Sequence, residues 1–117
     1  MKELYKANIE KQTLHNKYYR KVLYTTPQMQ LVLMNVPQGT DIGFESHKNA
    51  TQFIRVEKGA GVAYIADSKF ILKDGDAFII PSNTRHNVIA TTQDLQLYTL
   101  YAPPQHTKGT VEKVKMD

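Results

Sequence analysis

The chain has no cysteine, so disulfide bonds and thiolate metal sites are both excluded. That composition agrees with a reducing compartment, and we expect a cytoplasmic protein. No run approaches the 18 or so consecutive apolar residues that a membrane span needs, and residues 1–3 lead into nothing like a signal-peptide core. We therefore expect a soluble protein with no membrane partner.

A basic cluster is also lacking, although the net charge is +4 and the pI is about 9.3. The lysines and arginines near both ends of the chain are mixed with acidic residues rather than gathered on one face with interleaved aromatics. A nucleic-acid site would need such a face. The distribution favours an ordinary solvated surface, and we expect no nucleic-acid partner.

Turn chemistry recurs every eight to twelve residues, and no segment has a convincing helical period. This pattern is typical of a β-sandwich or β-barrel, and 117 residues suit one such domain. We expect an all-β domain over residues 20–104. About nine strands are predicted, at 21–25, 29–36, 41–48, 51–57, 62–66, 69–72, 77–80, 86–91 and 95–101.

The two ends of the chain are more polar than the predicted domain. Residues 1–19 are interpreted as an extended N-terminal arm with room for one helical turn, which either frays or lies across a second copy. Residues 105–117 are expected to be a peripheral or disordered tail. His15 and His106 fall in these two segments, and we interpret both as surface residues.

Two stretches, 43–52 and 74–88, each bring a histidine to a predicted strand. In the first, Glu45, His47 and Asn49 alternate, so their side chains would share one face of a strand, and Gln52 follows on the next strand. In the second, His86 comes at the start of a strand after a short turn. A single histidine of this kind is more often an ordinary hydrogen-bonded residue than a metal ligand.

The spacing of these residues resembles the two motifs of the cupins, small β-barrels of the double-stranded β-helix or jelly-roll type that commonly hold one metal ion. Two of four positions match in the first motif and three of five in the second. The corresponding residues are His47, Asn49, Gln52 and Gly59, then Gly75, Pro81, Asn83, His86 and Ala90. Asn83 stands where the family has glycine, and asparagine tolerates the positive φ that such a turn requires.

The likeness covers roughly residues 22–104. It is strongest to short single-domain cupins related to the C-terminal half of type II mannose-6-phosphate isomerases. It implies a divalent ion, with Zn, Mn, Fe and Ni all left open, held by His47, Gln52, His86 and Glu45. Asn49 is a poor substitute for an imidazole and Gln52 is neutral, so the ligand set carries less negative charge than is usual in the family.

The resemblance further implies a small-molecule substrate and a sugar or sugar-phosphate isomerase-like enzyme. Glu45 is the candidate general base if it does not ligate the metal. Arg85, one residue before His86, is a candidate contact for an anionic group such as a phosphate, and the alternative is a solvent-facing arginine in a turn. Two alternatives remain: a non-catalytic module that binds a small molecule or metal, and a non-haem Fe(II) oxygenase, whose sites use two histidines and one carboxylate. Many cupins pair through an N-terminal arm, which favours a homodimer here.

Three tyrosines on predicted strands, Tyr64, Tyr98 and Tyr101, are expected in the core or an interface, and one of them would line the cavity. Arg55 alternates away from Gln52 on its strand, so its side chain should point outward.

Overall fold

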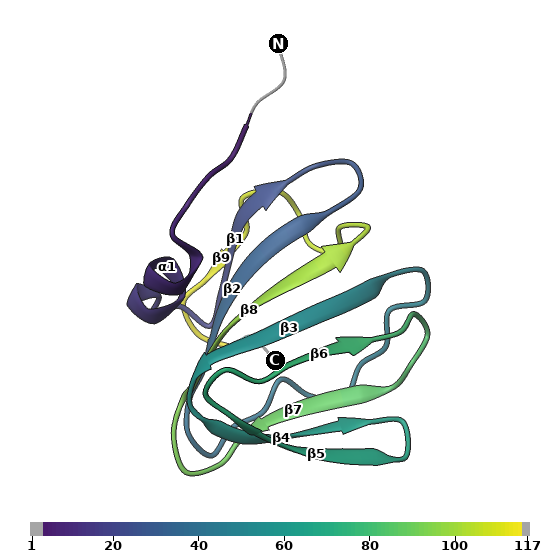
Figure 1. Cartoon of the computed structure of the whole chain (residues 1–117). Helices are drawn as coiled ribbons and strands as arrows, with labels where there is room; N and C mark the ends of the chain where they lie inside the picture. The colour runs from purple at the N-terminus through teal and green to yellow at the C-terminus, as the bar shows by residue number, and fades with distance from the viewer. Residues whose placement is uncertain (1–3, 116–117) are drawn as a thin grey trace.

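The computed structural model describes residues 4–115, and this part of the chain is nearly all β (Figure 1). It contains one short helix, α1 (Ile9–His15), and nine strands. The strands are β1 (Arg20–Thr25), β2 (Gln30–Val36), β3 (Thr51–Lys58), β4 (Ala60–Ile65), β5 (Ser68–Lys73), β6 (Ala77–Ile80), β7 (His86–Ala90), β8 (Leu95–Ala102) and β9 (Val111–Glu112). The predicted all-β fold is confirmed.

The strands form two antiparallel sheets that enclose the core (Figure 1). One sheet has six strands in the order β6-β3-β8-β2-β1-β9, and the other has three in the order β5-β4-β7. The buried apolar side chains come from both sheets and include Val32, Ile54, Ala63, Val88 and Leu97. Side chains that alternate along each strand therefore meet between the sheets, as in a jelly roll.

Strand β3 shows how this alternation separates the inside from the outside. Gln52, Ile54 and Val56 are buried, whereas Arg55 is partly exposed and pairs with Glu57, with 3.0 Å between Nη2 and Oε1. The outward orientation predicted for Arg55 is thus confirmed.

The inward positions are apolar at one end of the six-stranded sheet and polar at the other. At the polar end, Tyr101 of β8 lies between Gln30 of β2 and Gln52 of β3 in the strand register. All three side chains are buried. Burying polar atoms is costly unless they find partners, so this end of the interior is where a bound group is expected.

Residues 41–48 do not form the predicted strand. Only two isolated antiparallel bridges occur there, between Asp41 and Ile89 and between Glu45 and His86. Gly43 has a φ of 98°, in the region that favours glycine, and this conformation interrupts an extended run. The segment is a loop that touches β7 at two points.

Residues 9–15 of the N-terminal arm form a helix, where an extended arm with room for one helical turn was predicted. The Asn8 side chain accepts a hydrogen bond from the Lys11 backbone N–H at 3.0 Å and so caps α1. Thr13 is fully buried, and the amide of Gln96 on β8 donates to the Leu14 carbonyl at 2.9 Å. Residues 9–15 therefore pack on their own barrel, while residues 1–3 of the predicted arm lie outside the described residues.

The C-terminal segment is not merely peripheral. Strand β9 pairs with β1, where Arg20 lies opposite Glu112 and their side chains form an ion pair at 2.5 Å. For residues 111–112 this pairing corrects the disordered alternative and agrees with the peripheral one, because they form a strand at the edge of the sheet. Residues 116–117 lie outside the described residues.

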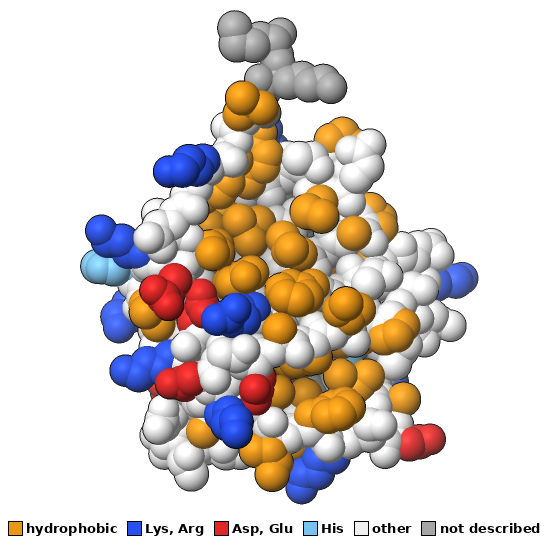
Figure 2. Space-filling model, viewed as in Figure 1, with side chains coloured by type: hydrophobic (Ala, Val, Ile, Leu, Met, Phe, Trp, Pro, Cys, Tyr) orange, Lys and Arg blue, Asp and Glu red, His pale blue; other side chains and the backbone are white. Residues whose placement is uncertain are grey.

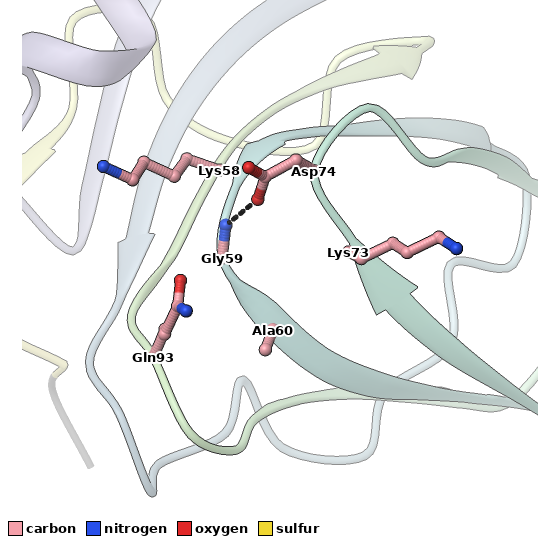
Figure 3. A pocket seen from close by; sticks show the side chains of 6 residues that line it. All are labelled: Lys58, Gly59, Ala60, Lys73, Asp74 and Gln93. Carbon is pink, nitrogen blue, oxygen red and sulfur yellow. Dashed lines mark hydrogen bonds between the residues drawn. The ribbon is translucent and has the colours of Figure 1, made fainter.

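A turn at the apolar end ties β3 and β4 to the loop before β6. The Gly59 N–H donates to Asp74 Oδ1 at 2.8 Å (Figure 3). The Gly75 N–H donates to the Val56 carbonyl, also at 2.8 Å. Gly59 adopts a φ of 135° there. A small cleft next to this turn is lined by Lys58, Gly59, Ala60, Lys73, Asp74 and Gln93, and it contains no histidine.

In residues 4–115 there is no helix long and apolar enough to span a bilayer, since α1 has seven residues.

Candidate metal centre

Glu45, His47 and His86 come together at the polar end of the interior. One ligand atom from each lies within 4.8 Å of the others. Glu45 Oε1 is 3.4 Å from His47 Nε2 and 3.6 Å from His86 Nε2, and the two imidazole centroids are 5.6 Å apart. In the described part of the chain, this is the one place where three such side chains are found so close together.

A backbone bridge between two distant segments places Glu45 beside His86. The Glu45 N–H donates to the His86 carbonyl at 3.0 Å, and the His86 N–H donates to the Glu45 carbonyl at 2.9 Å. Glu45 and His47 do lie together, as predicted. The cause is this bridge, and not the alternation of Glu45, His47 and Asn49 along a strand. Asn49 is exposed, which removes it from the site.

The imidazole of His86 is held in one orientation. Its Nδ1 lies 2.8 Å from the Thr84 carbonyl oxygen, which can only accept, so Nδ1 carries the proton. In the neutral form of the ring, Nε2 then presents its lone pair toward Glu45 and His47. A carbonyl that fixes the far nitrogen in this way is typical of metal-binding histidines.

His47 is fixed by its backbone and by a ring contact. Its carbonyl accepts a hydrogen bond from the Asn83 N–H at 2.7 Å, which ties the first segment to the turn before His86. Its ring packs edge-on against Tyr101, with centroids 5.3 Å apart. Tyr101 is thus the tyrosine that lines the site, a choice that the sequence left open among three.

The two imidazole Nε2 atoms are buried and have no hydrogen-bond partner. Their distances to Glu45, 3.4 and 3.6 Å, are too long for strong hydrogen bonds. Side-chain exposure falls from 31% for Glu45 to 14% for His47 and 3% for His86, so the group runs from the mouth of the cavity inward. Buried nitrogen atoms without partners fit a bound cation better than an empty interior.

The electrostatics of the group also suit a cation. Burial by itself raises the pKa of Glu45, but the two imidazoles outweigh it and lower that pKa to about 2. Burial lowers the pKa of His86, and the opposing effects of Glu45 and the Thr84 carbonyl leave it raised. Glu45 is therefore a carboxylate at neutral pH, and its negative charge attracts a positive charge between the rings.

Gln52 lies opposite Tyr101 in the strand register and is 2% exposed. Its Nε2 donates to Thr99 Oγ1 at 3.0 Å, and that hydroxyl in turn donates to the Phe53 carbonyl at 2.8 Å. This arrangement fixes the amide and leaves Oε1 buried without a partner. Gln52 therefore offers an oxygen, and its role as a fourth ligand stays a prediction.

The model of the cupin domain family matches residues 32–101 of this chain. The chain belongs to the cupin family. As a cupin, it is 40% identical over 115 residues to the uncharacterized protein L612 of Acanthamoeba polyphaga mimivirus, covering 94% of this chain and 72% of L612. It is 41% identical over 118 residues to the uncharacterized protein YrkC of Bacillus subtilis strain 168, covering 95% of this chain and 63% of YrkC. The chain thus spans less than two thirds of YrkC.

Two solved structures are similar as well. The crystal structure of BH2720 from Bacillus halodurans has a TM-score of 0.93 and 38% identity, covering 95% of this chain and 89% of that one. The structure of KdgF from Halomonas sp. has a TM-score of 0.70 and 28% identity, covering 74% of this chain and 78% of that one. These likenesses show the same fold beyond the matched residues 32–101. The finer resemblance to type II mannose-6-phosphate isomerases remains a hypothesis.

The cupin motifs fit the backbone that they occupy. Asn83 has a φ of 55°, which confirms that asparagine takes a left-handed position where the family has glycine. Gly59 and Gly75 have φ values of 135° and 88°. The motif residues thus set the turns that place His47 and His86.

Arg85 lies at the surface, whereas His106 departs from its predicted surroundings. Arg85 is exposed, and its guanidinium stacks 4.0 Å from the centroid of Phe44, so a contact with substrate stays a prediction. His106 is not the surface residue that was predicted, because its ring contacts Tyr101 at 5.1 Å and its Nε2 is buried. Its position depends on Gln30, 76 residues away, and no local sequence pattern points to it. His15 is exposed, as expected.

Proposed function

We propose that this cupin binds one divalent metal ion through Glu45, His47 and His86, with Gln52 Oε1 as a fourth ligand, and that it acts on a small molecule held there. One observation carries the proposal: the imidazole nitrogens His47 Nε2 and His86 Nε2, beside the Glu45 carboxylate, and the amide oxygen Gln52 Oε1 are buried without hydrogen-bond partners. A set of two imidazoles and oxygen ligands suits Zn, Mn, Fe or Ni. When bound, such an ion supplies Lewis-acid chemistry.

The chain's own residues would orient the group and keep water from its inner side. The Thr84 carbonyl holds the His86 ring, and Thr99 holds the Gln52 amide. Tyr101 and Ile80, both at most 2% exposed, close the inner end. A rigid site of this kind binds a substrate in one orientation.

The reaction implied by the family resemblance is an aldose–ketose exchange on a sugar or sugar phosphate. Glu45 was the candidate base for it. A carboxyl group whose pKa is about 2 is a weak proton acceptor at neutral pH, and this favours Glu45 as a ligand rather than as the base. The role of Glu45 as the general base of an isomerase stays a prediction.

A second candidate reaction rests on the ligand set itself. Two histidines and one carboxylate around one point match the ligand type of non-haem Fe(II) oxygenases. A non-catalytic cupin that holds a small molecule or the metal alone is the third possibility. These three candidate functions differ in what the metal-loaded protein converts: a sugar, molecular oxygen, or nothing.

Elemental analysis of the full chain, purified without added metal, is expected to find close to one divalent ion per chain. Stripping the protein with a chelator and adding back Zn, Mn, Fe or Ni separately should restore that stoichiometry for the preferred ion. A protein that retains and regains no divalent metal in these experiments would contradict the proposal.

Activity assays on the loaded protein then separate the three candidates. Turnover of hexose or pentose phosphates between aldose and ketose forms selects the isomerase. Oxygen consumption with iron, and not with zinc or manganese, selects the oxygenase. Tight retention of a small molecule without either reaction selects the binding module.

A homodimer formed through the N-terminal residues stays a prediction. Leu4 is 92% exposed, and an apolar groove beside it is lined by Leu4, Tyr5, Tyr24, Thr26, Met29, Leu31 and Leu100. Figure 2 shows hydrophobic side chains gathered on this side of the molecule below the N-terminal segment. Covering such a surface with a second copy would remove apolar area from water.

Sedimentation of the full chain at micromolar concentration is expected to show a dimer. Leu4→Asp should weaken the dimer, because it would bury a charge in the interface. Val114→Asp changes another exposed apolar residue, 67% exposed and outside the groove, and should have no effect. A monomer in every sample would contradict the prediction.

The absence of cysteine and the dispersed basic residues still favour a cytoplasmic protein that does not bind nucleic acid. Both statements stay predictions.

A further inference from the structure

His106 is held in the interior by a buried glutamine. Gln30 is fully buried, its Nε2 donates to the His106 carbonyl at 2.7 Å, and its Oε1 accepts from the His106 N–H at 3.1 Å and the Gln105 N–H at 3.3 Å. The side-chain amide of Gln30 thus forms hydrogen bonds with the backbone of residues 105–106, in the way that the backbone of a neighbouring strand would. His106 is fixed by these contacts rather than left on a loose tail.

The ring of His106 extends the row of side chains that begins at the metal group. Tyr101 contacts both His47 and His106, with ring-centroid distances of 5.3 Å to His47 and 5.1 Å to His106. The Nε2 atom of His106 is buried and has no hydrogen-bond partner. A buried polar atom fixed in this way calls for a partner, and a bound group can supply one.

Arg20 approaches the same place from β1. It lies two residues before buried Val22, so the two side chains face the interior, and its own side chain is 12% exposed. Nη1 pairs with Glu112, but Nε is buried without a partner. The guanidinium is close enough to His106 that its charge, after burial, helps to lower the pKa of that imidazole.

The charges in this part of the interior favour an anion once a metal is bound. Glu45 and Glu112 contribute two negative charges and Arg20 one positive charge, which leaves one excess negative charge. A divalent ion on the Glu45–His47–His86 group reverses the sign and leaves one excess positive charge. A singly charged anion would neutralise it in a setting of low dielectric.

We propose that Arg20 Nε and His106 Nε2, beside Tyr101, form a subsite for the carboxylate or phosphate group of a small molecule whose other end reaches the metal group. With its proton on Nε2, His106 donates one hydrogen bond and Arg20 Nε donates a second. Gln30 and Glu112 act as positioning residues for these two donors. This inference rests on the proposed metal site and names the class of molecule that the site takes.

Three hexose derivatives test the subsite in calorimetric titrations of the zinc-loaded full chain. Glucose 6-phosphate, gluconate and glucose carry a phosphate, a carboxylate and no charge on similar carbon chains. At least one anion is expected to bind about tenfold or more tightly than glucose, since hydrogen bonds to charged groups are the strong ones. Which anion binds identifies the group, and equal weak binding of all three would overturn the proposal.

Two conservative variants test whether the anion binds at Arg20 and His106. Arg20→Lys keeps a positive charge opposite Glu112 but removes Nε, and His106→Phe keeps a ring against Tyr101 but removes Nε2. Each should weaken binding of the preferred anion by about tenfold or more, while zinc affinity changes by less than about threefold. Arg55→Lys is the matched control, because Arg55 also has a glutamate partner and an unpartnered Nε but lies on the outer face.

The outcomes separate this subsite from the metal site. A chain that binds no metal refutes the proposed function itself. A chain that binds zinc normally, but whose anion affinity is unchanged in both variants, refutes only the subsite. If Arg85→Gln abolishes anion binding and Arg20→Lys does not, the anion lies at the exposed mouth, which would also overturn the subsite.

Discussion

Replacing His86 by alanine should weaken binding of the divalent ion by more than about 100-fold, because loss of an outer-shell partner alone typically costs about 10- to 100-fold and this residue is a direct ligand candidate. His86 is the most deeply buried member of the group, with 3% side-chain exposure. Its backbone hydrogen bonds with Glu45 do not involve the imidazole, so the barrel should remain folded. Calorimetric zinc titration and far-ultraviolet circular dichroism measure the two properties separately.

His15→Ala is the control for this experiment, because His15 is an exposed histidine at the end of α1. Its removal should leave the zinc affinity of the protein unchanged. If His86→Ala does not fold, His47→Ala takes its place, because the His47 side chain is more exposed, at 14%. Folded protein with either substitution and undiminished zinc affinity would show that the imidazoles are structural.

Local turn chemistry made the second cupin motif predictable. Gly75 and Pro81 bound a short apolar strand, and the tolerance of Asn83 for positive φ, here 55°, allows the turn that delivers His86 to β7. Each of these signals lies within a dozen residues of the histidine. The sequence therefore placed His86 correctly at the start of a strand.

The first motif was predicted with the right ligands but the wrong local structure. Alternation placed Glu45 and His47 on one strand, whereas Gly43 interrupts that segment and a two-bond bridge to His86 orients Glu45. The bridge joins residues 41 positions apart. A pattern that considers only neighbouring residues cannot distinguish such a loop from a strand.

The contribution of the C-terminal segment could not be predicted from the sequence. Strand β9 has two residues and exists because β1 offers it an edge, with Arg20 opposite Glu112. The Gln30 side chain that holds His106 looks in the sequence like one more polar residue at a strand end. Its burial follows from a partner 76 positions away, and tertiary context of this kind overrides local pattern.

Gly59→Ala is expected to lower the free energy of unfolding by about 3 kcal/mol or more, because it combines backbone strain with overpacking. The φ of 135° lies in a region that residues with a Cβ rarely adopt. The added Cβ would lie 2.3 Å from the Asp94 carbonyl oxygen and 2.9 Å from Leu95 Cα. Both neighbours are backbone atoms where β8 begins, so neither can rotate away. Urea unfolding monitored by circular dichroism measures the loss.

Gly75→Ala separates the two contributions, since Gly75 has a φ of 88° but no atom within 4 Å of the added Cβ. It should cost only the strain of a left-handed residue, about 1 to 2 kcal/mol. Because Leu95 is fully buried in the core, a shift of its backbone would disturb the packing of both sheets, whereas the turn at Gly75 faces open space. Equal losses for the two variants would mean that β8 yields at little cost, and the steric argument for glycine at position 59 would then be wrong.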